Sequence, residues 1–206
     1  MSPEDYEKVA EIAKPNIVTA DRVDEIERET RHDIMALTKA MAEAAGDSGW
    51  CIHLGATSND IVDSAVALQI RDSINLQQDT LKKLLSTMCD LAERERDTVM
   101  LGRTHGQAAV PITFGLKVAV WVDEFRRHLD RLDELTPRVI TGKFLGAVGT
   151  GAAQGENAFE LQNLIMQNLG LQTPVATTQV VGRDRYIEWV SWMANVSTSI
   201  EKALQE

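Results

Sequence analysis

Helix-breaking residues are distributed very unevenly along this sequence, and their distribution constrains the fold more than any other feature. There is no proline between Pro15 and Pro111, and no glycine between Gly55 and Gly102. Glycines gather instead in one run, at positions 142, 146, 149, 151 and 155. Long segments without breakers, joined by short segments that are rich in them, are typical of helical proteins. We therefore predict an all-α protein with a few irregular junctions.

The longest of these segments predicts one helix from Thr57 to about Asp97, with its apolar side chains on one stripe. At about 1.5 Å per residue, this helix would be roughly 60 Å long. A compact domain of this size needs no helix of that length. Such helices usually belong to an extended bundle, often one that is shared between subunits.

Apolar periodicity predicts further helices on either side. The first follows Asp21, which we expect to be its N-cap, and continues to about Gly46. Others are expected over residues 113–135, 157–168 and 183–206. The last reaches the final residue without a stop signal, so we expect the sequence to end inside a helix. These elements predict a partial N-terminal helical domain over residues 1–55 and a partial central long-helix bundle domain over residues 56–206.

Charge and composition narrow the range of partners. The chain has 206 residues, with 31 acidic against 21 basic side chains and a net charge of -10. Such a surface repels phosphate backbones and anionic membranes, so we expect no nucleic-acid and no membrane partner. A small anionic substrate would need a local basic site. The first residues lack a signal-peptide pattern, no apolar run is long enough to span a bilayer, and Cys51 and Cys89 form no disulfide framework. We therefore expect a cytoplasmic protein.

Two junctions in the N-terminal third contain polar residues that the helical pattern does not explain. In Arg31-His32-Asp33, His32 lies off the apolar stripe of its predicted helix. This position fits a solvated face, or a ligand-facing group with Arg31 as an anion donor. The second junction is His53-Leu54-Gly55-Ala56-Thr57-Ser58-Asn59-Asp60. Its four capping residues can satisfy the free N–H groups of the long helix, or use them to bind a carboxylate or phosphate.

Two more junctions follow the long helix. Residues 102–115 predict a polar loop in which His105 stands between Thr104 and Gly106. Because Gly106 has no side chain, a ligand can approach His105 closely, and imidazole suits proton transfer near neutral pH. A linker histidine bonded to backbone would fit this loop as well. The glycine-rich run at 142–151 predicts a tight turn or hairpin, and it is followed by polar residues at 177–179 and 183–184.

Several familiar site motifs can be excluded. Lys143 is followed by Phe144 rather than by serine or threonine, which excludes a P-loop. The glycines at 149 and 151 lack the third glycine and the βαβ setting of a dinucleotide site. Cys51 and His53 have no second pair at metal-ligand spacing, and no serine or cysteine has the setting of a nucleophile elbow. Histidine-based acid–base chemistry on an anionic ligand remains, with no cofactor and no metal.

Taken together, four stretches of the sequence resemble the adenylosuccinate lyase family of the fumarase/aspartase superfamily. In chain order they are Arg31–Ala36, His53–Asp60, Arg103–Ala108, and Gln179 with Arg183-Asp184. Their order and separations agree with the family, and the resemblance covers nearly the whole chain. The first and third stretches separate this family from fumarases, aspartases and argininosuccinate lyases better than the second does.

The resemblance implies a fold and a reaction. The fold is an elongated all-α subunit whose long central helices assemble into a homotetramer, with active sites that combine residues of three subunits. The reaction is a β-elimination that releases fumarate from adenylosuccinate and leaves AMP. The succinylated carboxamide ribotide of the same purine biosynthesis pathway would be cleaved in the same way.

The resemblance also implies roles for the residues of the first and third stretches. His105 would be the general acid that protonates the departing nitrogen, and Thr104 beside it would bind substrate. His32 would help to hold both the substrate and His105. Arg31 and Asp33 would contact the nucleotide.

The remaining stretches would bind the rest of the substrate. Thr57 and Ser58 would bind the succinyl part at the helix N-terminus, and Gln179 would hydrogen-bond the substrate. His53 would lie in the site region. Fixed donors would then stabilise the carbanion character that develops beside a carboxylate.

Two features of the family have no counterpart in this sequence. One is a flexible signature loop, rich in serine, methionine, lysine and asparagine, whose serine acts as the general base. The other is an N-terminal Arg-Tyr contact to the nucleotide phosphate. We therefore expect an internal fragment that carries the acid half of the machinery, and its own turnover stays open. The alternatives are another lyase or cycloisomerase of the superfamily, and a non-catalytic helical assembly module.

Overall fold

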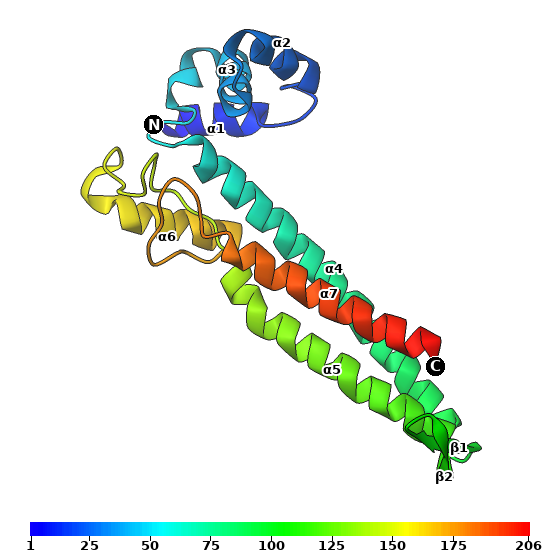
Figure 1. Cartoon of the computed structure of the whole chain (residues 1–206). Coiled ribbons are helices and arrows are strands. Elements are labelled where there is room, and N and C mark those ends of the chain that lie inside the picture. The colour runs from blue at the N-terminus through cyan, green and yellow to red at the C-terminus, as the bar shows by residue number, and fades with distance from the viewer. The chain divides into compact units, whose positions relative to one another are not determined.

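The computed structural model describes residues 1–206, which divide into two compact units. The first unit comprises residues 1–64, 143–168 and 173–181, and the second comprises residues 65–142, 169–172 and 182–206. Helices dominate both units, and the one sheet has two strands (Figure 1), which confirms the all-α prediction apart from that sheet. The predicted division after residue 55 is a different one and stays a prediction. No helix has both the length and the apolar character that crossing a membrane requires.

Short helices lead the first unit: α1 (Pro3–Ile12), α2 (Ala20–Thr30), α3 (Asp33–Ala45) and the 3-10 helix η1 (Gly46–Cys51). The sequence pattern did not predict α1, which begins with a capping box between Ser2 and Asp5. The N-cap of α2 is Thr19 rather than the predicted Asp21, because the Thr19 hydroxyl accepts the Arg22 N–H at 3.3 Å. The core between α2 and α3 contains Ile26, Ala36 and Ala40.

The single helix predicted from Asp21 to Gly46 is wrong, because the chain breaks after Thr30. Arg31 has a left-handed φ of 52° and ends α2. His32 then has an extended backbone, and its Nδ1 atom caps α3 by accepting the Met35 N–H at 3.3 Å. Two short amphipathic helices in succession can continue one apolar period. The periodicity of the sequence therefore does not reveal the break.

The rest of the first unit contains the first residues of α4, the glycine-rich segment, η2 (Gly155–Asn157), most of α6 (Ala158–Leu169) and residues 173–181. The glycine-rich segment forms turns rather than a hairpin, with Gly151 N donating to Leu145 O at 2.9 Å. Gly149 has a φ of 78°, and a Cβ atom there would lie 2.1 Å from Thr177 O. Glycine at 149 therefore permits the close approach of the segment that carries Gln179.

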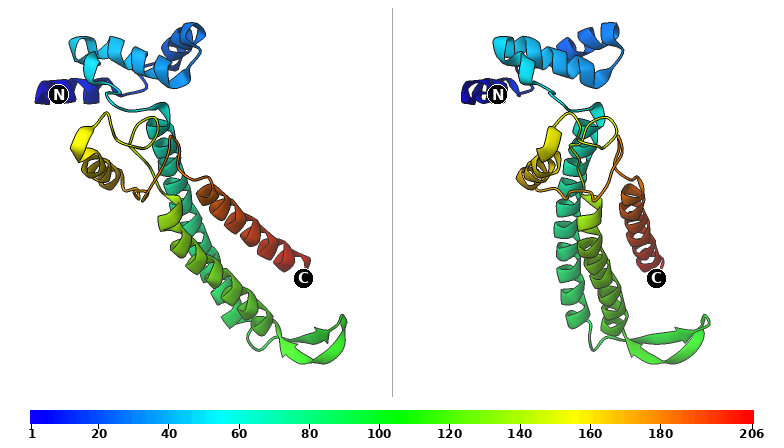
Figure 2. Two further views of the ribbon diagram at one scale, coloured as in Figure 1. Left: turned by 60° about the vertical axis from the view of Figure 1, so that its left-hand side comes forward. Right: turned by 90° about the vertical axis from the view of Figure 1, so that its left-hand side faces the viewer.

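The second unit is built on three long helices: α4 (Ser58–Arg94, from residue 65 onward), α5 (Phe114–Val139) and α7 (Asp184–Gln205). They run side by side in Figures 1 and 2. Their apolar stripes form a core that includes Ile74, Val118, Phe125, Leu132 and Trp192. The predicted helices agree with α4, α6 and α7 within a few residues. α5 continues through Pro137 to Val139, beyond the predicted end at residue 135.

The polar loop predicted over residues 102–115 is wrong. This region forms an antiparallel hairpin of β1 (Val99–Thr104) and β2 (Gln107–Thr113). His105 and Gly106 form its two-residue turn, with φ values of 53° and 73°. Positive φ at both positions is typical of a type I′ turn, which matches the twist of the two strands. Because most residues of the two strands are exposed, no alternation of buried and exposed residues marks the strands in the sequence.

Candidate active site

Two of the polar junctions meet within the first unit. The Nε2 atom of His32 lies 3.3 Å from the Ser58 Oγ atom, which joins the N-cap of α3 to the first residue of α4. The Nδ1 atom of the same ring accepts the N–H of Met35. In a neutral imidazole this leaves the proton on Nε2, which then donates to the Ser58 hydroxyl. The ring is thus held by contacts at both nitrogens, yet its side chain is 46% exposed and open to a ligand.

Arg31 and Asp33 lie on either side of His32. Arg31 is exposed, and its backbone N–H donates to Glu27 O at 2.7 Å, which closes α2. One carboxylate oxygen of Asp33 lies 3.3 Å from His32 Nδ1 and accepts the Ile34 N–H at 2.7 Å. The trio therefore presents a guanidinium, an imidazole and a carboxylate at one helix junction.

The turn before α4 is held in one geometry by hydrogen bonds. Thr57 N donates to Asp60 Oδ2 at 2.9 Å, which is one half of a capping box. Gln154 Nε2 donates to Gly55 O at 2.6 Å. Thr57 and Ser58 are half-buried at this helix start, where free N–H groups and the helix dipole favour an anion.

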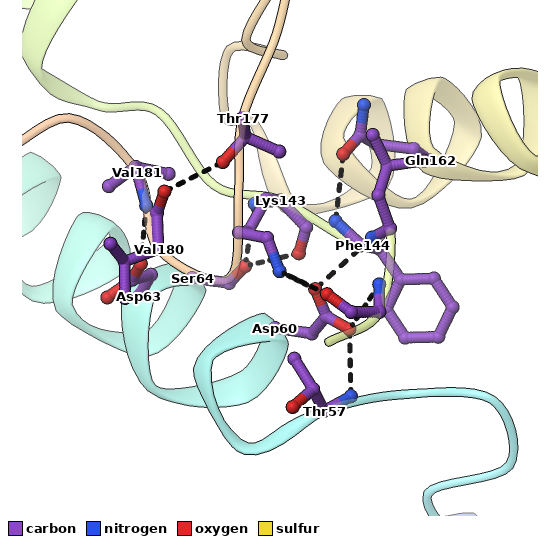
Figure 3. Close-up of polar contacts among 12 residues, drawn as sticks. Thr57, Asp60, Asp63, Ser64, Lys143, Phe144, Gln162, Thr177, Val180 and Val181 are labelled. Atoms are coloured by element: carbon purple, nitrogen blue, oxygen red, sulfur yellow. Dashed lines mark hydrogen bonds and ion pairs between the residues drawn. The ribbon is translucent and has the colours of Figure 1, made fainter. Parts of the chain in front are cut away.

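A fully buried ion pair lies beside this turn (Figure 3). Lys143 Nζ contacts Asp60 Oδ1, and both side chains have 0% exposure. Asp60 also accepts the N–H groups of Leu145 at 3.2 Å and Gly146 at 3.0 Å. The sequence prediction missed this pair. The available signal was a lysine inside an apolar, glycine-rich run, because a buried ammonium needs an acidic partner.

Gln179 belongs to the first unit and is exposed. The segment around it is fixed by neighbouring residues. Thr177 Oγ1 donates to Val180 O at 2.8 Å, and Val181 N donates to Asp63 Oδ2 at 2.8 Å (Figure 3). No hydrogen bond joins Gln179 to another predicted site residue, so its predicted role depends on a ligand.

The predicted acid, His105, and the adjacent Thr104 belong to the second unit. Thr104 pairs with Gln107 at the end of the hairpin ladder, and His105 occupies the turn. Both side chains are exposed. The predicted site residues are thus divided between the two units.

Three of the predicted site residues share an uncommon backbone conformation. Arg31, His53 and His105 are the only non-glycine residues with positive φ, at 52°, 65° and 53°. For an L-residue this region costs about 1–2 kcal/mol, and such strain is concentrated at functional sites. The backbone thus marks three residues that the sequence motifs had selected independently.

The chemistry available in these segments is proton transfer by imidazole, hydrogen bonding by hydroxyl and amide groups, and anion binding at a helix start. No group of three or more histidine, cysteine, aspartate or glutamate side chains is placed to hold a metal ion.

Comparisons with known proteins extend this description. A family model described as lyase matches residues 5–206. The chain is 47% identical over 205 residues to the adenylosuccinate lyase of Pyrococcus abyssi, which covers 99% of this chain and 46% of the relative. It is 49% identical over 201 residues to the adenylosuccinate lyase of Pyrococcus horikoshii, and this alignment covers 97% of this chain and 45% of the relative. The chain therefore spans about half the length of these curated relatives.

Solved structures give the same picture of the fold. A fumarate lyase from Mesorhizobium sp. BNC1 is similar with a TM-score of 0.89 and 35% identity, over 98% of this chain and 48% of that chain. A β-carboxy-cis,cis-muconate cycloisomerase from Acinetobacter calcoaceticus sp. ADP1 is similar with a TM-score of 0.89 and 27% identity, over 100% and 49%.

Proposed function

Since the chain belongs to the lyase family, we propose that it acts in the β-elimination of fumarate from adenylosuccinate, which leaves AMP. The proposal extends to the succinylated carboxamide ribotide of purine biosynthesis. Two adenylosuccinate lyases share 47% and 49% sequence identity with this chain, which supports the proposal. Further support comes from four motifs that occur in the same order as in that family. We place this activity in the cytoplasm, with no metal and no cofactor.

The observation that carries the proposal is the contact between His32 and Ser58. This contact joins the stretch Arg31–Ala36, which is the more specific to adenylosuccinate lyases, to the stretch His53–Asp60 at the start of α4, which is less specific. Adenylosuccinate has a nucleotide part and a succinyl part, so a site with one motif for each part must hold the motifs side by side. In this proposal Arg31 and Asp33 contact the nucleotide, while Thr57 and Ser58 bind the succinyl carboxylates with the N-terminus of α4.

In the proposed reaction, His105 donates a proton to the nitrogen as the C–N bond breaks, which avoids expulsion of an anionic leaving group. Thr104, His53 and Gln179 contact the substrate around this step. Loss of the proton from the neighbouring carbon builds negative charge beside a carboxylate, which fixed hydrogen-bond donors stabilise. We assign the acid to His105 and assign no residue of this sequence to the base.

We also propose that the chain functions as a homo-oligomer, and as a tetramer in the whole protein. Large apolar side chains are exposed on the long helices, including Val120 at 58%, Ile187 at 66% and Leu204 at 83%. Exposed apolar surface of this extent favours association. As the resemblance to the adenylosuccinate lyase family implies, the proposal includes sites that are completed by other copies.

The test is fumarate release from adenylosuccinate by the purified chain and by its His105→Ala variant. A Val110→Ala variant is the matched control, because Val110 is 71% exposed on the same hairpin and outside the proposed site. Because no residue of this sequence is assigned to the base, the expectation is comparative: fumarate released by the wild type is also released by the control and is not released by His105→Ala. Equal and negligible rates in all three would contradict the proposal and favour the non-catalytic assembly module.

A second candidate is a cycloisomerase or another lyase of the same superfamily. It is favoured by the TM-score of 0.89 to the muconate cycloisomerase, which equals that to the fumarate lyase. Incubation with β-carboxy-cis,cis-muconate and with adenylosuccinate in parallel separates the candidates. Only the first proposal predicts consumption of adenylosuccinate.

A further inference from the structure

The buried Asp60–Lys143 pair is not among the residues expected to touch substrate, yet it contacts the turn that carries two of them. The Asp60 carboxylate accepts the Thr57 N–H on one side. On the other side it accepts two N–H groups of the glycine-rich segment, from Leu145 and Gly146. One carboxylate therefore joins the first turn of α4 to a segment that lies more than 80 residues later in the sequence.

Lys143 is fixed along its whole length. Its backbone N–H and C=O both bond to the Ser64 hydroxyl, each at 3.2 Å. At the other end its Nζ atom reaches Asp60 and donates to Gly146 O at 3.3 Å. Replacing a buried ion pair by apolar residues of similar volume is often neutral or even stabilising. Stability alone therefore does not account for this pair.

The charge of the pair bears on anion binding. Asp60 lies in the first turn of α4. A carboxylate there offsets the partial positive charge of the helix N-terminus and repels a second anion. The Lys143 ammonium cancels that charge at contact distance. The turn thus gains the order that the carboxylate provides without keeping its negative charge.

We propose that Asp60 and Lys143 are positioning residues for an anion bound at Thr57 and Ser58. Asp60 orders the turn, and Lys143 keeps the turn electrostatically open to a carboxylate. The identity of that anion, the succinyl part of the substrate, rests on the proposed function.

The test compares Lys143→Met, Asp60→Asn and the double variant D60N/K143M, with fumarate as the probe. Fumarate affinity is measured by isothermal titration, and thermal midpoints report stability. Lys143→Met leaves a carboxylate unpaired, and at an effective dielectric constant of about 20 one unit charge within about 10 Å of an anion weakens its binding roughly ten-fold or more. Asp60→Asn removes the repelling charge, so we expect this variant to bind fumarate much more tightly than Lys143→Met does. The neutral double variant recovers most of the loss.

The results separate an electrostatic role from a merely structural one. Equal loss of affinity in both single variants, in proportion to their thermal midpoints, overturns the proposal. If Lys143→Met does not fold, the neutral double variant decides, because it carries no unpaired charge, and a ten-fold loss of affinity relative to the wild type overturns the proposal as well.

Amide hydrogen exchange gives a readout that needs no substrate. The Thr57 and Gly146 amides donate to Asp60, so we expect faster exchange of both in Asp60→Asn. If the wild type binds no fumarate, the proposed function fails, and these two amides still test the positioning role. Unchanged exchange there would show that Asp60 does not order the turn.

Discussion

The buried His128 makes the stability of the second unit depend on pH in a defined direction. Its side chain is 1% exposed. The Ser199 hydroxyl donates to Glu124 at 2.6 Å, so it accepts from His128 Nε2 at 2.8 Å. Arg131 donates to the other ring nitrogen at 3.4 Å. Both nitrogens are thus committed in the neutral ring, and burial, followed by the charge of Arg131, lowers the pKa of His128 below 6.5.

The sign of the effect follows from linkage. With a folded-state pKa below the unfolded value of 6.5, the unfolded chain binds more protons in the window between the two values. The contribution of neutral His128 to the free energy of unfolding is therefore fully present above about pH 6.5, and it falls as the pH is lowered through that window. One proton changes the free energy of unfolding by at most about 1.4 kcal/mol per pH unit. Lowering the pH from about 7.5 to about 5.5 thus removes up to about 1.4 kcal/mol.

The assay is urea unfolding at these two pH values for the wild type and for His128→Gln, since glutamine can donate to Ser199 but does not titrate. Titrating groups that do not interact with His128 contribute equally to both proteins, so the difference in pH dependence reports His128 together with Glu124, which is coupled to it. Val118→Ala is the matched control. It opens space in the α5 core without removing a titratable group, and should keep the wild-type pH dependence. If His128→Gln loses as much stability between the two pH values as the wild type does, His128 is not the source of the pH dependence.

Two further pairs of variants test local structure by urea unfolding. Thr19→Ala removes the N-cap of α2 and should lower the free energy of unfolding by about 1 kcal/mol. Asp21→Ala changes the second residue of the helix and should lower it less. The reverse order would indicate that Asp21 is the cap. Gly106→Ala has open space around its Cβ and should cost about 1 kcal/mol for its left-handed φ alone. Gly149→Ala adds the clash with Thr177 O and should cost more than about 3 kcal/mol; similar losses at both glycines would contradict the close approach seen here.

The helical frame was predictable because it depends on information that is local and repeated. α4, α6 and α7 lie in segments without breakers, with apolar residues at helical spacing over many turns. The two largest errors occur where one or two residues determine the backbone path. Arg31 ends α2 in a conformation that glycine or asparagine would have signalled, and His105-Gly106 forms a hairpin turn for which Asn-Gly is the usual sign.

The candidate site was predictable only as far as its motifs extend. The motifs selected His32 and Ser58 separately, and the structure adds their contact. The partnership of Asp60 with Lys143 joins residues that are 83 positions apart, and no local pattern identifies one as the partner of the other. Such pairings depend on tertiary structure, which periodicity and capping rules do not contain.

The left-handed residues have a consequence for attempts to engineer this chain. Glycine adopts positive φ without steric cost, so glycine at positions 31, 53 or 105 would relieve about 1 kcal/mol of strain at each. The same three replacements would delete one guanidinium and two imidazole groups. A library ranked only by melting temperature would therefore favour the loss of these side chains, whereas a library ranked by ligand binding would retain them.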